Sequence, residues 1–276
     1  MNAPRLRPSP IAGTWYPANP EKLAASIDGQ LSEAVIPELD SQIIAIVAPH
    51  AGHRYSGRVA AHAFAALRGH HPELIVVVSP YHNYDPHPLL TTAHEAYATP
   101  LGNIDVDKIA LADLQSQLPI PIATIANDPE HSLEIELPFL QRVFSHDFKL
   151  LPLMIRAQEE QVAHQLGGAL AAILQTRNAL LVASTDLSHF YDQKTANNLD
   201  REMLRCFESL DPPSIFRAEQ TGKGYACGHA AVAAVEWVAK HLGANRAQIL
   251  NYATSGDVTG DYSSVVGYGA VVITKQ

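Results

Sequence analysis

The sequence predicts an α/β fold in which helices flank a central, mostly parallel sheet, because short apolar runs alternate with amphipathic segments along the chain. Continuous runs rich in β-branched residues are typical of parallel strands that are buried on both faces. Four such runs are present, at residues 43–48, 74–79, 149–155 and 179–184. Strands and helices that alternate in this way favour right-handed crossover connections.

Segments between and after these runs carry apolar residues at three- and four-residue spacing, which predicts helices. These helices are expected at residues 58–67, 133–144, 159–174, 199–210 and 230–242. Two late strands are predicted at 248–253 and at the valine-rich segment 264–274. No fixed-period repeat and no Gly/Ser-rich or Pro-rich linker divides the sequence, so we expect one domain over residues 1–276.

Composition excludes several classes of protein. Hydrophobic residues make up 47% of the 276 residues and charged residues 17%, which is unlike a disordered chain. The net charge of -9 and the absence of Lys/Arg clusters argue against a nucleic-acid partner. No stretch reaches the roughly 18 uninterrupted apolar residues of a membrane span, and no secretory segment is recognisable. We therefore expect a cytoplasmic protein with no membrane partner.

Polar side chains follow three of the predicted strands at the point where each strand ends. His50 follows the run 43–48, His82 follows 74–79, and Asp186 and His189 follow 179–184. Ligands of open α/β sheets bind beyond the carboxyl ends of the strands. Adjacent strands lie about 4.8 Å apart, so these side chains can converge. The pattern predicts one site at this edge of the sheet.

The two cysteines have different surroundings. Cys227 directly precedes the predicted helix 230–242, where unpaired N–H groups favour a thiolate, whereas Cys206 lies among apolar neighbours and is expected in the core. Two neutral imidazoles, His50 and His82, with one thiolate, Cys227, would form a three-ligand set suited to zinc, iron or copper. Such a set leaves positions open for water, dioxygen or substrate.

An acid/base pair is predicted beside this metal set. A carboxylate at Asp186 could orient the imidazole of His189 and raise its basicity, and a general acid/base is the natural role for His189. The alternative is that Asp186 or Ser188 caps the following helix. Both roles remain open at this level.

Three further residues are candidates for substrate contact. His131 lies in the segment 127–134, which mixes a turn signal with a helix start that Ser132 could cap. Tyr81 directly precedes His82, and His53 comes three residues after His50, close enough to be an alternative ligand or a second proton carrier.

An ordered set of short motifs resembles the MEMO family, also named AmmeMemoRadiSam system protein B. The resemblance runs nearly end to end. It rests on Arg7-Pro8, Ala12-Gly13, Trp15-Tyr16-Pro17, Pro49-His50-Ala51-Gly52, Tyr55-Ser56-Gly57, Thr99-Pro100-Leu101-Gly102, His131-Ser132-Leu133-Glu134, Leu137-Pro138-Phe139-Leu140, Ser184-Thr185-Asp186-Leu187-Ser188-His189 and Cys227-Gly228. This chain departs from the family pattern at His53, where the family commonly has tyrosine, and at Ser79, where it commonly has glycine.

The family resembles a divergent branch of the class III extradiol dioxygenases, whose α/β fold holds non-haem Fe(II) with two histidines and a carboxylate. The resemblance implies His50, His82 and Cys227 as the metal ligands, with Asp186 and His189 lining the same pocket. A thiolate in place of the carboxylate conserves charge but is softer, so copper and zinc compete with iron.

The leading functional hypothesis is a non-haem, metal-dependent redox enzyme, dioxygenase-like, that acts on a small phenolic substrate with one divalent transition metal, iron being favoured over copper or zinc. A runner-up is a non-catalytic protein that uses the same cleft to bind a metal or a protein or peptide partner. A third hypothesis is a zinc-type metallohydrolase in which His189 activates metal-bound water.

Overall fold

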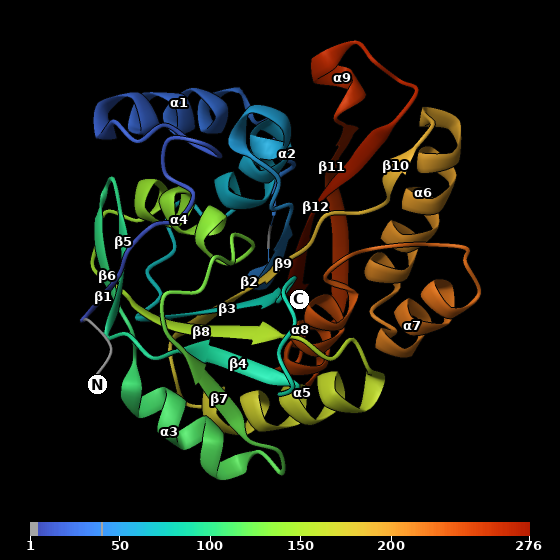
Figure 1. Cartoon of the computed structure of the whole chain (residues 1–276). Coiled ribbons are helices and arrows are strands. Elements are labelled where there is room, and N and C mark those ends of the chain that lie inside the picture. The colour runs from blue at the N-terminus through green and yellow to red at the C-terminus, as the bar shows by residue number, and fades with distance from the viewer. Residues whose placement is uncertain (1–4, 40) are drawn as a thin grey trace.

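The computed structural model describes residues 5–39 and 41–276 and contains a nine-stranded sheet with helices on both faces (Figure 1). Its four central strands are parallel and lie in the order β2 (Gln42–Ala48), β9 (Ala179–Ser184), β3 (Leu74–Pro80) and β8 (Lys149–Ile155). The four strand runs of the sequence form this centre, which confirms the α/β class.

Antiparallel strands extend the sheet on both sides, so that it is mixed and only its centre is parallel. β12 (Val265–Lys275) pairs antiparallel with β2, with β11 (Arg246–Thr254) and with β10 (His189–Tyr191). On the other side β4 (Leu89–Thr92) is antiparallel to β8 and parallel to β7 (Ile122–Ile125). β11 and β12 are antiparallel because the short helix α9 (Gly256–Thr259) links them as a hairpin, without a crossover.

The central strands bury both faces, which explains their continuous apolar composition. In β3, Val76 and Val78 belong to one apolar cluster and Ile75 and Val77 to the other, as expected from the two-residue side-chain period of a strand. One cluster is covered by α3 (Lys108–Gln117), α5 (Glu160–Leu174), α6 (Gln193–Ser209), α7 (Pro212–Gln220) and α8 (His229–His241). The opposite cluster is covered by α1 (Pro20–Glu33), α2 (His53–Ala65) and α4 (Leu137–Val143).

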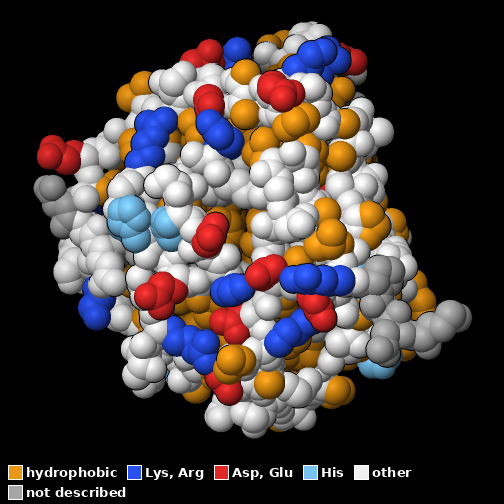
Figure 2. All heavy atoms as spheres, turned by 90° about the vertical axis from the view of Figure 1, so that its left-hand side faces the viewer, with side chains coloured by type: hydrophobic (Ala, Val, Ile, Leu, Met, Phe, Trp, Pro, Cys, Tyr) orange, Lys and Arg blue, Asp and Glu red, His pale blue; other side chains and the backbone are white. Residues whose placement is uncertain are grey.

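A small second sheet holds the N-terminal segment against the body of the molecule. It consists of β1 (Leu6–Arg7), β5 (Ala96–Thr99) and β6 (Gly102–Asp105). On the face that carries β5 and β6, Lys and Arg side chains lie interspersed with Asp and Glu (Figure 2). Among the described residues, no helix is both long and apolar enough to cross a bilayer.

The helix boundaries differ from the sequence prediction where side chains other than the apolar ones decide them. The helix predicted at 199–210 begins at Gln193, because Asp192 accepts hydrogen bonds from the backbone N–H groups of Lys194 and Thr195. The segment 133–144 forms a 3-10 turn, η1 (Glu134–Glu136), followed by α4, and Ser132 does not cap it, since its hydroxyl donates to the carbonyl of Pro80. The sequence patterns did not predict α1, α3, α7 or the short strands β4 to β7.

Candidate metal centre

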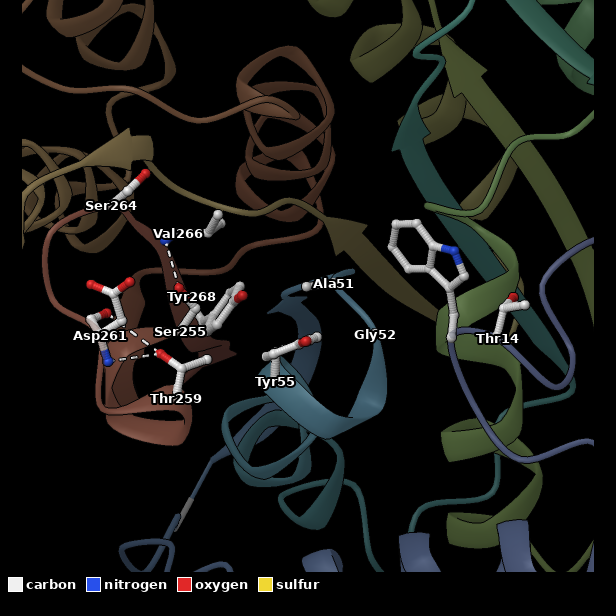
Figure 3. A pocket seen from close by; sticks show the side chains of 11 residues that line it. Thr14, Ala51, Gly52, Tyr55, Ser255, Thr259, Asp261, Ser264, Val266 and Tyr268 are labelled. Atoms are coloured by element: carbon white, nitrogen blue, oxygen red, sulfur yellow. Dashed lines mark hydrogen bonds between the residues drawn. The ribbon is translucent and has the colours of Figure 1, made fainter.

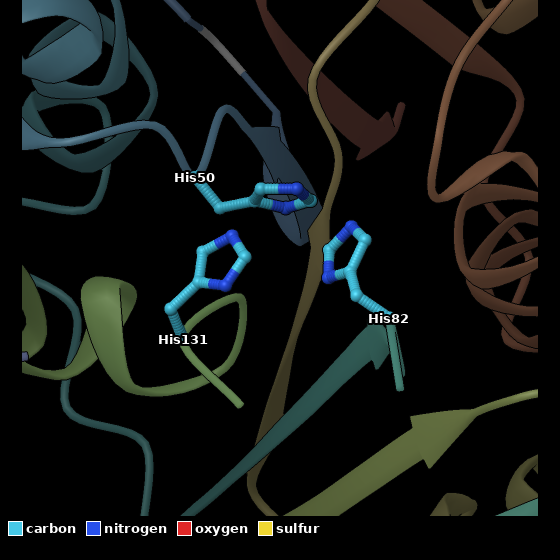
Figure 4. Close-up of side chains that lie close together, drawn as sticks. All are labelled: His50, His82 and His131. Carbon is cyan, nitrogen blue, oxygen red and sulfur yellow. The ribbon is translucent and has the colours of Figure 1, made fainter. Parts of the chain in front are cut away.

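Three histidine rings lie close together at the carboxyl edge of the parallel strands (Figure 4). His50 follows β2, His82 follows β3, and His131 lies in the loop that leads into η1. One ring nitrogen from each lies within 4.8 Å of the other two. The group could therefore hold a metal ion, because neutral imidazole nitrogens are common ligands of transition metals.

The order of the strands brings these residues together. β9 lies between β2 and β3, and Ala48 of β2 is paired with Ser184 of β9. The loop with His131 joins them because the hydroxyl of Ser132 donates to the carbonyl oxygen of Pro80, at 2.7 Å, at the end of β3. The strand ends thus determine two members of the trio, and a tertiary hydrogen bond positions the loop of the third.

His50 is buried and is held through its backbone and its ring. Its N–H donates to Oδ1 of Asp186 at 2.8 Å, and its Nδ1 lies 3.0 Å from Oγ of Ser184. Burial, together with the nearby His131 and His82, lowers the pKa of His50 well below its usual value. The ring is therefore neutral near pH 7, and its Nε2 faces away from Ser184.

Glu130 holds His82 in position. Its Oε1 lies 2.9 Å from Nδ1 of His82, and its Oε2 accepts the backbone N–H of the same residue at 2.6 Å. Burial raises the pKa of Glu130, but the hydrogen bonds from His82 and Ser132 outweigh it and hold the pKa well below its usual range. In the neutral ring of His82, a proton on Nδ1 that is donated to this carboxylate leaves Nε2 with its free electron pair, the arrangement found around many metal-bound histidines.

His131 stacks between aromatic neighbours. Its ring centroid lies 4.8 Å from that of His82 and 4.1 Å from that of Trp15. Burial lowers the pKa of His131 to about 4, although the charge of Glu130 opposes this shift. His131 was predicted as a substrate contact from the sequence, and the structure brings its ring nitrogen to those of His50 and His82.

Cys227, in the loop before α8, lies beside His50 but is not a member of the group whose ligand atoms lie within 4.8 Å of one another. Its Sγ lies 3.1 Å from Nε2 of His50 and 3.6 Å from the carbonyl oxygen of Asp186. Gly228 allows this approach, since a Cβ there would collide with the carbonyl oxygen of Ser184. The expectation of a lowered thiol pKa is wrong for the metal-free chain, because burial and the charge of Asp186 raise the pKa of Cys227.

Asp186 and His189 do not form the pair that their spacing suggested. Asp186 accepts the backbone N–H groups of His50 and Ala51 through Oδ1, and burial raises its pKa to about 7. His189 is oriented instead by the carbonyl oxygen of Leu187, 2.8 Å from its Nδ1. Asp186 does not cap a helix either, because α6 is capped by Asp192.

Comparison with known proteins gives the family of the chain. The sequence profile of a family described as Memo-like protein matches residues 7–272. The chain belongs to the Memo family. A MEMO1 family protein of Nitrosopumilus maritimus is 34% identical over 96% of this chain and 98% of its own length. The MEMO1 family protein MK0963 of Methanopyrus kandleri is also 34% identical, with the same coverage of both chains.

A solved structure shows the same fold at low sequence identity. An uncharacterized protein of Escherichia coli K12 superposes on this Memo-family chain with a TM-score of 0.52 and 13% identity. The match covers 83% of this chain and 99% of the other. At this identity the likeness concerns the fold alone.

The two remaining predicted site residues of this Memo-family chain, His53 and Tyr81, are buried and pack against other parts of the protein. Nε2 of His53 lies 3.0 Å from the carbonyl oxygen of Ile135, and the His53 ring contacts that of Phe139 at 4.8 Å between centroids. Tyr81 is buried, and its backbone N–H donates to the carbonyl of Ile155. Neither residue supplies a ring or side-chain atom to the histidine trio, as far as the described residues extend.

A pocket of about 530 Å³ lies next to the segment that carries His50, although none of the three histidines lines it (Figure 3). Ala51 and Gly52, which directly follow His50, form part of its wall, and Trp15 links it to His131 by ring contact. Aromatic rings of Tyr55 and Tyr268 and small hydroxyl side chains line it, and Asp261 is the one charged side chain in the lining. The pocket therefore suits an organic molecule with an apolar body and no negative charge.

Proposed function

We propose that this protein is a non-haem, metal-dependent redox enzyme, dioxygenase-like, that acts on a small phenolic substrate. The observation that carries the proposal is a group of three histidines, His50 buried, His131 half-buried and His82 exposed, next to an apolar, aromatic-lined pocket. His50, His82 and Cys227 are the proposed ligands, and His131 is a further donor within reach. Bound there, the metal would bring dioxygen and a substrate oxygen to neighbouring positions.

The number of protein ligands decides whether a given metal keeps an open position at which a substrate can react. A tetrahedral zinc ion held by three imidazoles and the thiolate would have no open position, whereas a six-coordinate iron would keep about two. Iron therefore suits an enzyme, and zinc at all four donors suits the alternative of a non-catalytic metal-binding protein. The four donors His50, His82, His131 and Cys227 make this alternative worth testing beside the first.

His189 is the proposed general base. Its Nδ1 must donate to the carbonyl of Leu187, which can only accept, so the neutral ring presents an unprotonated Nε2. Burial lowers the pKa of His189, and the nearby His82 contributes in the same direction. The ring is therefore neutral near pH 7 and ready to take a proton from a phenolic hydroxyl. Trp15, Tyr55 and Tyr268 would hold the aromatic body of that substrate and exclude water.

The ligands can be tested by elemental analysis after anaerobic loading with iron, copper or zinc. We expect the His50→Ala, His82→Ala and Cys227→Ser variants each to retain clearly less metal than the unaltered chain, because each loses one donor from the site. The exposed His241 gives a matched control, and the His241→Ala variant should retain full metal. Undiminished metal in all three ligand variants would overturn the proposed site.

The base can be tested by oxygen uptake over a panel of phenols and catechols. We expect His189→Ala to keep its iron and to lose uptake by about 10²–10⁴-fold, the usual contribution of a positioned acid/base group. Uptake that is unchanged in this variant would remove His189 from the mechanism. No uptake by the unaltered chain with any metal would favour the non-catalytic binding protein.

A further inference from the structure

Ser184 stands at the centre of a buried cluster of polar atoms behind His50. Its Oγ lies 3.0 Å from Nδ1 of His50, 2.7 Å from the carbonyl oxygen of Ser132 and 2.7 Å from Oε1 of Glu136. Ser184 and Glu136 are both almost completely inaccessible to solvent. The three contacts must therefore be satisfied within the protein and not by bulk water.

The hydrogen-bonding capacity of a hydroxyl decides the direction of each contact. A serine hydroxyl donates one hydrogen and accepts two. The carbonyl of Ser132 can only accept, so the hydrogen of Ser184 goes there, and the other two partners must donate. Glu136 then carries a proton on Oε1, and His50 carries its proton on Nδ1. Any other assignment leaves at least one of these contacts, at 2.7 or 3.0 Å, between two acceptors without a hydrogen between them.

The surroundings of Glu136 agree with a neutral carboxyl group. Its Oε2 is buried and has no hydrogen-bond partner among the described residues. Burial raises the pKa of Glu136 well above its usual value, and the charge of Asp186 acts in the same direction, while the contact with Ser184 opposes the shift. An ionised carboxylate with one bare oxygen would be strongly destabilising here, because burial removes the water that would otherwise solvate its charge.

We propose that Glu136 is a positioning residue which, as a protonated donor acting through Ser184, holds His50 in the tautomer with hydrogen on Nδ1. In this tautomer Nε2, the nitrogen 3.1 Å from Sγ of Cys227, carries the free electron pair. The other tautomer would place a hydrogen where a metal must bind. The tautomer of His50 is inferred from hydrogen bonds within the chain. Only the inference that this tautomer favours metal binding rests on the proposed function.

The two carboxyl groups behind the histidines thereby act in opposite charge states. Glu130 is ionised and accepts from His82, whereas Glu136 is neutral and donates to Ser184. A glutamine can replace a neutral donor, because its amide nitrogen donates in the same place. It cannot replace an ionised acceptor without loss of charge. Glu136→Gln and Glu130→Gln are therefore a matched pair with opposite expected outcomes.

Two measurements on the full chain test the proposal. The first is the tautomer of His50 in metal-free protein, read from long-range ¹H–¹⁵N correlations, with the His50 signals assigned by their loss in His50→Ala. The second is the affinity for Zn²⁺, measured by competition with a chelator. Circular dichroism of each variant shows that it is folded, so that an effect on the ring is separable from loss of structure.

We expect the Nδ1–H tautomer of His50 both in the unaltered chain and in Glu136→Gln. The Zn²⁺ affinity of Glu136→Gln should differ from that of the unaltered chain by less than about tenfold. Glu136→Leu and Ser184→Ala should populate the other tautomer of His50 and bind Zn²⁺ about 10–100-fold more weakly. Glu130→Gln should also bind Zn²⁺ about 10–100-fold more weakly, but the tautomer of His50 should not change. An Nε2–H tautomer in the unaltered chain, or equal losses in Glu136→Gln and Glu136→Leu, would overturn the proposal. Absence of Zn²⁺ binding by the unaltered chain would overturn the metal centre and leave the tautomer result standing.

Discussion

Replacement of Arg7 by methionine is expected to lower the free energy of unfolding by about 3–5 kcal/mol, the usual cost of leaving buried charges unpaired. The guanidinium of Arg7 is buried and donates to both carboxylate oxygens of Asp128, at 2.7 and 2.9 Å. It also donates to Oε2 of Glu134 at 2.5 Å and to the carbonyl of Glu130 at 2.8 Å. Both carboxylates would lose their cation in the variant. Urea unfolding monitored by circular dichroism measures the change.

The same substitution at Arg5 is the matched control, because Arg5 forms an exposed pair with Glu95 in the same segment. Arg5→Met should cost less than about 1 kcal/mol. Arg7→Lys should fall between the two, since lysine keeps the charge and loses the two-nitrogen contact. A loss below about 1 kcal/mol in Arg7→Met would show that Asp128 and Glu134 are stabilised by other means. The segment held by Arg7 carries Glu130 and His131, so Zn²⁺ affinity should fall with stability.

Replacement of Glu236 by glutamine is expected to change how stability depends on pH, by up to about 1.4 kcal/mol per pH unit. Glu236 lies fully buried in α8, and neither carboxyl oxygen has a hydrogen-bond partner among the described residues. Burial raises its pKa well above the usual value, and Asp211 adds to this shift while Lys240 opposes it. The folded chain therefore keeps a proton that the unfolded chain releases above about pH 4.3.

The proton held by Glu236 in the folded state determines the direction in which stability changes with pH. Because the folded state binds it more tightly, the contribution of Glu236 to stability is complete below about pH 4.3 and is lost as the pH rises towards the raised pKa. The free energy of unfolding of the unaltered chain should therefore fall relative to that of Glu236→Gln between about pH 5 and 8. Glu208→Gln, at an exposed position of α6, should follow the unaltered chain. Parallel curves for Glu236→Gln and the unaltered chain would contradict the burial of a protonated carboxyl group.

Much of the sheet was predictable from the sequence because its central strands are buried on both faces. Such strands are continuous apolar runs, and the four runs correspond to β2, β3, β8 and β9. The short strands and α1, α3 and α7 were missed. Strands of four residues carry too little periodicity, and these helices are defined in part by local features such as Asn19 capping α1 and Asp107 capping α3.

The residues of the candidate site also fall into those that the sequence predicted clearly and those that it signalled only weakly. His50 and His82 were predictable because they follow apolar runs, and Cys227 because of its place before a helix. Glu130 directly precedes His131 in the segment 127–134, and this was the available signal for its role. Glu136 gave a weaker signal, as an acidic residue within an otherwise apolar stretch.

The sequence by itself determined which residues stand at the ends of neighbouring strands, because parallel strands align their carboxyl ends at one edge of the sheet. Only the tertiary structure decided what surrounds them. Glu130 meets His82 across 48 residues of chain, and Ser184 meets His50 across 134. Contacts of this range depend on how loops pack over the sheet, and local periodicity carries no information about them. For that reason the charge states of Glu130 and Glu136 and the tautomer of His50 are determined by tertiary contacts and cannot be inferred from any one sequence motif.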